Sequence, residues 1–200
     1  VSAEPGARLG IGFDAPLGAD AMRQAAIDGS IERLLTWHSV SPGDFFYIPA
    51  GTVHAIGAGI GLIEVQQTSD ITYRLYDWGR VDKHGRSRQL HLEDSLAVVN
   101  LAAQPVPAQA SVISQREDGL HERLLDTPFF RLDRLSGCDK FACLPDPARC
   151  SVLTALSPMT LAWEAQSLQL SAGQSALLPA MGYPLRLSGK SALIAFPATD

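Results

Sequence analysis

An apolar run that enters a proline–glycine turn constrains the fold of this chain more than any other feature. Residues 43–54 read Gly-Asp-Phe-Phe-Tyr-Ile-Pro-Ala-Gly-Thr-Val-His. Proline presets φ and glycine tolerates a positive φ, so Pro49 and Gly51 allow the backbone to reverse and re-enter a sheet. The turn therefore fixes the direction of the His54 imidazole at the start of the returning strand, which suits a metal ligand.

The spacing Gly-x5-Pro-x-Gly-x2-His resembles the second motif of the cupins, small double-sheet β-barrels that bind a metal in the barrel. The cupin motif usually continues with Asn four residues after the His, where this chain has Ala58. Residues 173–180 repeat the Gly-x5-Pro-Ala spacing of residues 43–50, but no His follows. We infer two related barrels, of which the first carries the chemistry and the second binds no metal.

Length and composition describe a folded globular chain. The 200 residues are 46% apolar and 18% charged, which allows one large domain or two small ones. The net charge of −5 argues against a nucleic-acid partner. Apolar runs fall well short of the roughly 18 residues of a membrane span, and the N-terminus lacks the regions of a signal peptide. We therefore expect a cytoplasmic protein, and we expect Cys138, Cys143 and Cys150 to be reduced thiols.

The predicted fold is mainly β, with cupin-like jelly-roll barrels and a short helical insertion at about residues 18–36. Within that insertion Asp20 is the predicted N-cap of a helix that Gly29 ends, and Ser30 is the predicted cap of a second short helix. The other predictions are a helix at 91–99 and strands at 7–13, 44–49, 53–56, 60–67, 71–76, 129–135, 151–156, 159–165, 167–171, 174–178, 184–188 and 191–196.

The composition changes near residues 101–110, which are rich in Ala, Pro and Gln and are expected to be a linker. Residues 1–100 are predicted to form a metal-site cupin domain that is incomplete at its N-terminus. Residues 111–200 are predicted to form a degenerate cupin-like β domain.

Three charged side chains follow the His54 turn in a predicted strand–turn–strand segment. Glu64 lies among apolar neighbours in a strand, and a carboxylate directed into a barrel costs several kcal/mol unless it is paired. Asp70 lies in the turn and Arg74 in the next strand. If these strands are neighbours, both acids and the guanidinium converge near His54. The structural alternatives are an ion pair of Glu64 with Arg74, a turn cap for Asp70 and a hydrogen-bonded turn residue for His54.

Four other histidines are not expected to belong to the site. His91 is predicted to begin the 91–99 helix and to face solvent. His38, His84 and His121 are predicted to lie on the surface or in loops.

The first half of the chain closely resembles the type I mannose-6-phosphate isomerases. The residues that carry the resemblance are Glu4–Ala7, Pro42–Ile56, Glu64, Gln66-Gln67, Ser69-Asp70, Tyr73-Arg74, Tyr76-Asp77 and Leu90–Glu93. The resemblance is specific over about residues 1–100 and implies a zinc-dependent aldose–ketose isomerase of carbohydrate metabolism. Such an enzyme interconverts mannose 6-phosphate and fructose 6-phosphate.

The resemblance also implies roles for individual residues. By position, His54 matches a zinc ligand, Arg74 matches the active-site Arg, and Glu64 and Asp70 match active-site acids. The isomerisation moves a proton between C1 and C2 through an enediol, which needs a general base and positive charge at the developing oxyanion. Arg74 is assigned to the oxyanion or the phosphate. Either Asp70 or Glu64 is assigned to proton transfer or orientation, and the choice between them stays open.

The family's other zinc ligands, a Gln-x-His segment and a Glu, precede its Glu-Pro-Gly-Ala run, with which this chain begins. Catalytic zinc normally has three or more protein ligands, so one Zn²⁺ per site needs ligands that this chain lacks. We therefore expect a chain without its N-terminal part. The alternative is a non-catalytic truncated cupin module that binds a sugar phosphate or a protein partner; a regulatory sugar-binding protein using Arg74 without metal is a third option. Missing strands would leave an open sheet edge, which predicts a homodimer or poor solubility of the isolated chain.

Overall fold

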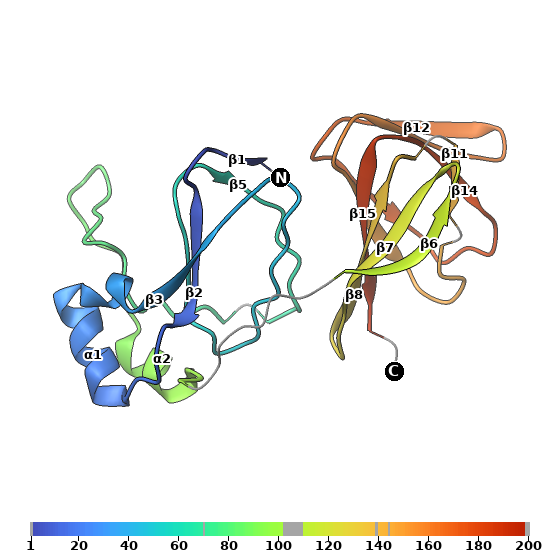
Figure 1. Ribbon diagram of the computed structural model, residues 1–200. Helices are drawn as coiled ribbons and strands as arrows, with labels where there is room; N and C mark the ends of the chain where they lie inside the picture. The colour runs from blue at the N-terminus through green and yellow to red at the C-terminus, as the bar shows by residue number, and fades with distance from the viewer. Residues whose placement is uncertain (1, 70, 102–109, 139, 144, 199–200) are drawn as a thin grey trace. The chain divides into compact units, whose positions relative to one another are not determined.

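The computed structural model describes residues 2–69, 71–101, 110–138, 140–143 and 145–198, and the described chain is mainly β (Figure 1). The chain divides into two compact units, Val1–Pro107 and Ala108–Asp200. No helix among the described residues is long and apolar enough to cross a membrane.

The first unit is built on a three-stranded antiparallel sheet of order β3-β2-β4, beside a two-stranded pair of β1 and β5. Its elements are β1 (Ser2–Ala3), β2 (Arg8–Phe13), α1 (Ala19–Asp28), the 3-10 helix η1 (Ser30–Arg33), β3 (Leu35–Ser39), β4 (His54–Ile56), β5 (Ile60–Gly61) and α2 (Leu92–Val98). Helices α1 and α2 pack their apolar sides on one core with residues of β2, β3 and β4.

The helical insertion forms much as predicted, but its caps differ. Helix α1 ends at Gly29, whose φ of 78° is the left-handed conformation that favours glycine at a helix end. Gly18 is its N-cap, and no side chain caps the helix. Asp20 instead lies in the first turn of the helix and pairs with Arg23 at 2.8 Å, so its prediction as N-cap was wrong. Ser30 is the first residue of η1, and Gly29 takes the cap position that was assigned to Ser30.

Several strand predictions in the first unit were wrong. Residues 44–49 and 71–76 form no strand, and the predicted strand 60–67 is reduced to β5 at its start. Strand β3 was not predicted. A strand exists only where another segment accepts its backbone hydrogen bonds. The apolar alternation of these segments is compatible with a sheet, but it does not supply a partner. The predictions at 7–13, 53–56 and 91–99 were confirmed as β2, β4 and α2.

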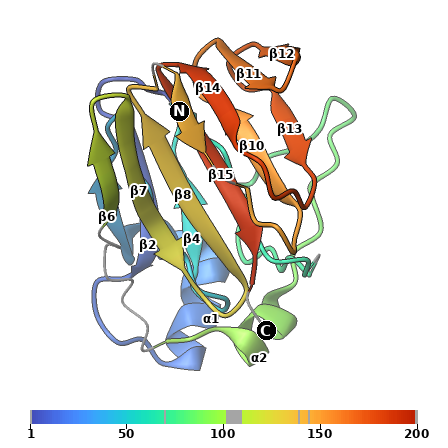
Figure 2. The same cartoon turned by 90° about the vertical axis from the view of Figure 1, so that its right-hand side faces the viewer.

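The second unit is a sandwich of two antiparallel sheets, and Figure 2 shows β6, β7, β8 and β15 side by side in the larger one. The orders are β13-β10-β15-β8-β7-β6 and β12-β11-β14-β9. The strands are β6 (Ser111–Arg116), β7 (Gly119–Asp126), β8 (Phe130–Ser136), β9 (Phe141–Cys143), β10 (Ser151–Ala155), β11 (Met159–Trp163), β12 (Gln166–Leu170), β13 (Ser175–Leu178), β14 (Leu185–Gly189) and β15 (Ser191–Pro197).

Alternating side chains of both sheets fill the core of this sandwich. In β15, for example, Ala192, Ile194 and Phe196 are buried while the residues between them are partly exposed. All seven strands that were predicted in this half are present, whereas β6, β7 and β9 were not predicted.

Each unit contains a turn of the same local structure, at residues 41–44 in the first unit and at residues 171–174 in the second. Its third residue is Gly43 or Gly173, with a φ of 93° or 83°. The side chain of the fourth residue accepts a hydrogen bond from the backbone N–H of the first, at 2.8 and 2.7 Å. The backbone N–H of the fourth residue donates to the carbonyl of the first at 3.1 Å in both turns. The repeated sequence spacing therefore corresponds to a repeated local turn, and the relation between the two barrels stays a prediction.

Candidate functional site

His54 begins strand β4 and is held by contacts with nearby backbone. It lies opposite Ile11 of β2 in the antiparallel register. Its Nδ1 lies 3.0 Å from the carbonyl oxygen of Thr52. A carbonyl can only accept, so Nδ1 carries the proton and Nε2 carries the lone pair. Histidines that bind metals commonly donate their second ring nitrogen to a carbonyl in this way. Because the side chain is exposed, Nε2 is accessible to a ligand.

The turn before His54 docks against the end of α2. Gly51 has a φ of 81°, and a Cβ at this position would lie 2.8 Å from the carbonyl oxygen of Val98. The backbone N–H of Asn100 donates to the Gly51 carbonyl at 2.9 Å. The turn therefore needs glycine for both its conformation and its close approach to the helix.

Arg74 is attached to the segment that leads into α2. The backbone N–H of His91 donates to the Arg74 carbonyl at 2.8 Å, and the Arg74 N–H donates to Nδ1 of the His91 ring at 3.2 Å. The Arg74 guanidinium donates through Nη1 to the Gln89 carbonyl at 3.3 Å. His91 thus faces Arg74 through its Nδ1, which corrects the expectation that it faces solvent.

The remaining predicted site residues are less constrained. Glu64 is exposed, and it follows β5 rather than lying within a strand. Asp70 lies outside the described residues, so its predicted role stays a prediction. Over the part of the chain that the structure describes, no hydrogen bond or ion pair joins His54, Glu64 and Arg74 to one another. Nor do three or more His, Cys, Asp or Glu side chains in that part lie where they could hold a metal ion.

Asp77 anchors the chain just after Arg74. The residue is only 5% exposed, and its Oδ1 accepts from Arg80 at 2.6 Å and from Arg88 at 3.4 Å. Its other carboxylate oxygen is buried and has no hydrogen-bond partner among the residues that the structure describes. In the sequence, Asp77 stands out only as one of the residues that carry the family resemblance. The carboxylate fixes the segment after Arg74 to the loop that returns toward His91.

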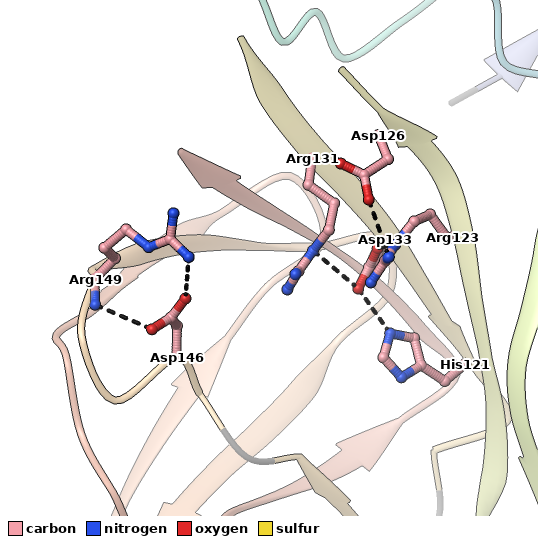
Figure 3. A network of polar contacts seen from close by, with 7 residues as sticks. All are labelled: His121, Arg123, Asp126, Arg131, Asp133, Asp146 and Arg149. Atoms are coloured by element: carbon pink, nitrogen blue, oxygen red, sulfur yellow. Dashed lines mark hydrogen bonds and ion pairs between the residues drawn. The ribbon is translucent and has the colours of Figure 1, made fainter. Parts of the chain in front are cut away.

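A second cluster of charges lies inside the second unit (Figure 3). The Asp133 side chain on β8 is 1% exposed and accepts from His121 at 2.9 Å and from Arg123 at 3.1 Å. Arg131 lies 3.6 Å from the same carboxylate, and its guanidinium stacks on Phe196.

The environment of Asp133 favours its charged form. Burial alone would raise the pKa of Asp133, but the hydrogen bonds from His121 and Arg123 and the charges of Arg131 and Arg123 hold this pKa below its ordinary value. The prediction that His121 is a surface or loop residue was wrong, because it lies on β7 and binds this buried carboxylate. The charged residues at alternate positions of β8 were the available signal, since alternate residues of a strand share a face.

No family model matches the chain, but its sequence is similar to those of proteins named as mannose-6-phosphate isomerases. It is 37% identical over 182 residues to a mannose-6-phosphate isomerase of Streptococcus mutans, which covers 90% of this chain and 56% of that protein. It is 45% identical over 112 residues to a mannose-6-phosphate isomerase of Bacillus subtilis, which covers 54% of this chain and 35% of that protein. The chain thus spans about half the length, or less, of these curated relatives.

Solved structures show the same fold. The crystal structure of a mannose 6-phosphate isomerase from Bacillus subtilis matches with a TM-score of 0.87 at 24% identity, over 98% of this chain and 62% of that one. A phosphomannose isomerase from Salmonella typhimurium matches with a TM-score of 0.66 at 13% identity, over 99% of this chain and 67% of that one. At such identities the likeness establishes the fold alone, and it confirms the predicted cupin-like architecture.

Proposed function

We propose that this chain, which belongs to the type I mannose-6-phosphate isomerase family, supplies part of a zinc and sugar-phosphate site that interconverts mannose 6-phosphate and fructose 6-phosphate. The observation that carries the proposal is the state of His54. Its Nδ1–H is bound to the Thr52 carbonyl, which leaves Nε2 as an accessible donor for a metal ion. The sequence relatives supply the reaction, since they are named as isomerases of this sugar phosphate.

The described residues fit a zinc ion only as a single ligand. A catalytic zinc normally has three protein ligands, and the described residues contain no group of three suitable side chains. We propose that the other ligands correspond to the Gln-x-His and Glu segments of the family. A bound zinc would polarise oxygen atoms of the sugar.

In this proposal residues of this chain stabilise the negative charge of the reaction and transfer the proton. Arg74 places positive charge where the enediolate oxygen or the phosphate binds, because guanidinium matches such anions with several donors. Either Glu64 or Asp70 takes the proton that moves between C1 and C2. The exposed carboxylate of Glu64 is free to rotate toward a substrate, since no ion pair in the described residues holds it. A cytoplasmic location and a homodimer that pairs through an open sheet edge of the first unit stay predictions.

The test measures zinc and turnover on the same preparations. The purified protein, its His54→Ala variant and a His84→Ala control are dialysed against zinc and analysed for metal content. Mannose 6-phosphate isomerisation is then measured by a coupled assay, together with Arg74→Ala. His84 is the matched control because it lies in an exposed loop. One tightly held zinc that is lost in His54→Ala but kept in His84→Ala would support the metal role of His54, and a fall in kcat of about 10²–10³ in Arg74→Ala would support the role of Arg74.

A second candidate function is favoured by the incomplete ligand set. If the wild-type protein binds fructose 6-phosphate in calorimetry but holds no zinc and has no activity, the chain is a non-catalytic sugar-phosphate module. If it binds neither zinc nor sugar phosphate, both candidate functions are refuted for this chain. Light scattering on the same samples tests the homodimer.

A further inference from the structure

We propose that His91 is the positioning residue for Arg74, and that its imidazole ring takes the place of a backbone acceptor. This inference rests on the proposed function of Arg74 at the sugar-phosphate site. It concerns a residue that the sequence analysis placed outside the site.

The hydrogen bonds between residues 74 and 91 resemble one half of an antiparallel pair. In such a pair each residue donates its N–H to the carbonyl of the other. The N–H of His91 donates to the Arg74 carbonyl at 2.8 Å as expected. The Arg74 N–H, however, cannot use the His91 carbonyl. That carbonyl already accepts from the backbone N–H of Ser95 at 2.8 Å and from the Ser95 hydroxyl at 2.6 Å.

The ring of His91 resolves this conflict. His91 occupies the N-cap position of α2, where a side chain commonly turns toward the helix, but its ring makes no cap hydrogen bond. Its Nδ1 instead accepts the Arg74 N–H at 3.2 Å. A side chain without an acceptor at the δ position would leave a partly buried N–H unsatisfied, which is unfavourable.

Contacts of helix α2 fix the position of His91. Ser95 is buried and binds the His91 carbonyl, while the neighbouring Leu92 and Leu96 pack against the core of the first unit. Arg74 is therefore bound through its backbone to a packed helix, and through Nη1 to the Gln89 carbonyl. The backbone contact sets where the Arg74 side chain starts, and a residue fixed in this way retains its orientation when a substrate binds.

The experiment compares two amides that differ only in where they place the acceptor. In His91→Asn the amide oxygen occupies the δ position of the ring, whereas in His91→Gln it lies one atom further out. His91→Ala removes the acceptor. Hydrogen exchange of the Arg74 backbone amide is measured by NMR in each variant, and the amides of α2 report any damage to the helix itself. We expect exchange at Arg74 to accelerate about tenfold in the Ala and Gln variants, with Asn close to wild type.

Turnover provides the second readout. We expect kcat/KM to fall by about ten- to a hundredfold in His91→Ala and His91→Gln, and to stay within about threefold of wild type in His91→Asn. If His91 acts through Arg74, His91→Ala has little further effect in an Arg74→Ala background.

Two results would overturn the inference. One is unchanged exchange at the Arg74 amide in His91→Ala, and the other is a full, additive loss of activity from His91→Ala in the Arg74→Ala background. If the amide behaves as expected but the wild-type protein has no isomerase activity, the proposed function fails and the positioning contact is supported.

Discussion

Replacing Asp133 by Asn tests whether the buried charge cluster holds the second unit together. The carboxylate is 1% exposed and lies within 3.6 Å of three cationic or potentially cationic groups, on His121, Arg123 and Arg131. Asparagine keeps the shape but removes the negative charge that Arg123 and Arg131 share, and Arg123 retains its exposed partner Asp126. Removing one partner of a buried ion pair costs about 3–5 kcal/mol, so we expect a loss of that size in the free energy of unfolding.

Asp126→Asn is the matched control, because Asp126 binds the same guanidinium of Arg123 at 3.0 Å but is 57% exposed. An exposed pair contributes at most about 1 kcal/mol, so this variant should remain close to wild type. Unfolding in urea is followed by hydrogen exchange of the β8 and β15 amides, which reports on the second unit alone. Equal losses in Asp133→Asn and Asp126→Asn would show that burial does not determine the strength of this cluster.

The contribution of Asp133 to the free energy of unfolding should depend on pH. The pKa of Asp133 is lower in the folded state than its ordinary value, so the folded state favours the charged form. The stabilisation is therefore fully present above the unfolded pKa of about 3.9 and is lost as the pH falls through the folded pKa. The difference in unfolding free energy between wild type and Asp133→Asn should shrink as the pH falls below about 4. A difference that grows on acidification would contradict the assignment.

Two further predictions concern the turn before His54 and the thiols. Gly51→Ala should destabilise the first unit more than Gly43→Ala and should reduce zinc content. Both glycines have φ above 80°, which costs other residues about 1–2 kcal/mol, but only the Gly51 Cβ would meet a backbone oxygen, at 2.8 Å; equal urea midpoints would refute this. Burial raises the pKa of Cys138 and Cys143 to about 11, so at pH 8 a thiol reagent should react rapidly with Cys150 alone. Rapid reaction of more than one thiol in the native protein would contradict it.

The sequence predicted elements well where a local signal determines them. Helix α1 ends at Gly29 because a left-handed residue is needed there, and the second unit's strands alternate because both sheets bury one face. The predictions failed where a distant partner decides, as at residues 44–49, whose apolar pattern does not specify which segment accepts their hydrogen bonds. The β6–β7 hairpin was missed although Asp118-Gly119 is a turn signal, because its strands are largely polar.

The sequence predicted a set of candidate site residues, but it did not predict how the described ones are held. The turn fixes His54, and the spacing alone indicated this. The hydrogen bond that holds the Arg74 backbone could not be predicted from the sequence. Its acceptor is the ring of His91, 17 residues away, and not a backbone carbonyl. The buried cluster around Asp133 was missed for a similar reason, since Arg123 and His121 come from a neighbouring strand whose register the sequence does not specify.

Helix α2 connects the two site residues that the structure describes best. Its first turn fixes His91, which holds Arg74, and its last residue, Val98, contacts the Gly51 turn that leads to His54. The helix has 7 residues and is therefore only about 10 Å long, so both contacts depend on the same short element. A substitution that loosens α2 should therefore disturb Arg74 and the His54 turn together, although neither residue lies on the helix. By contrast, Glu64 makes no such contact in the described residues, and its role in proton transfer or orientation stays a prediction.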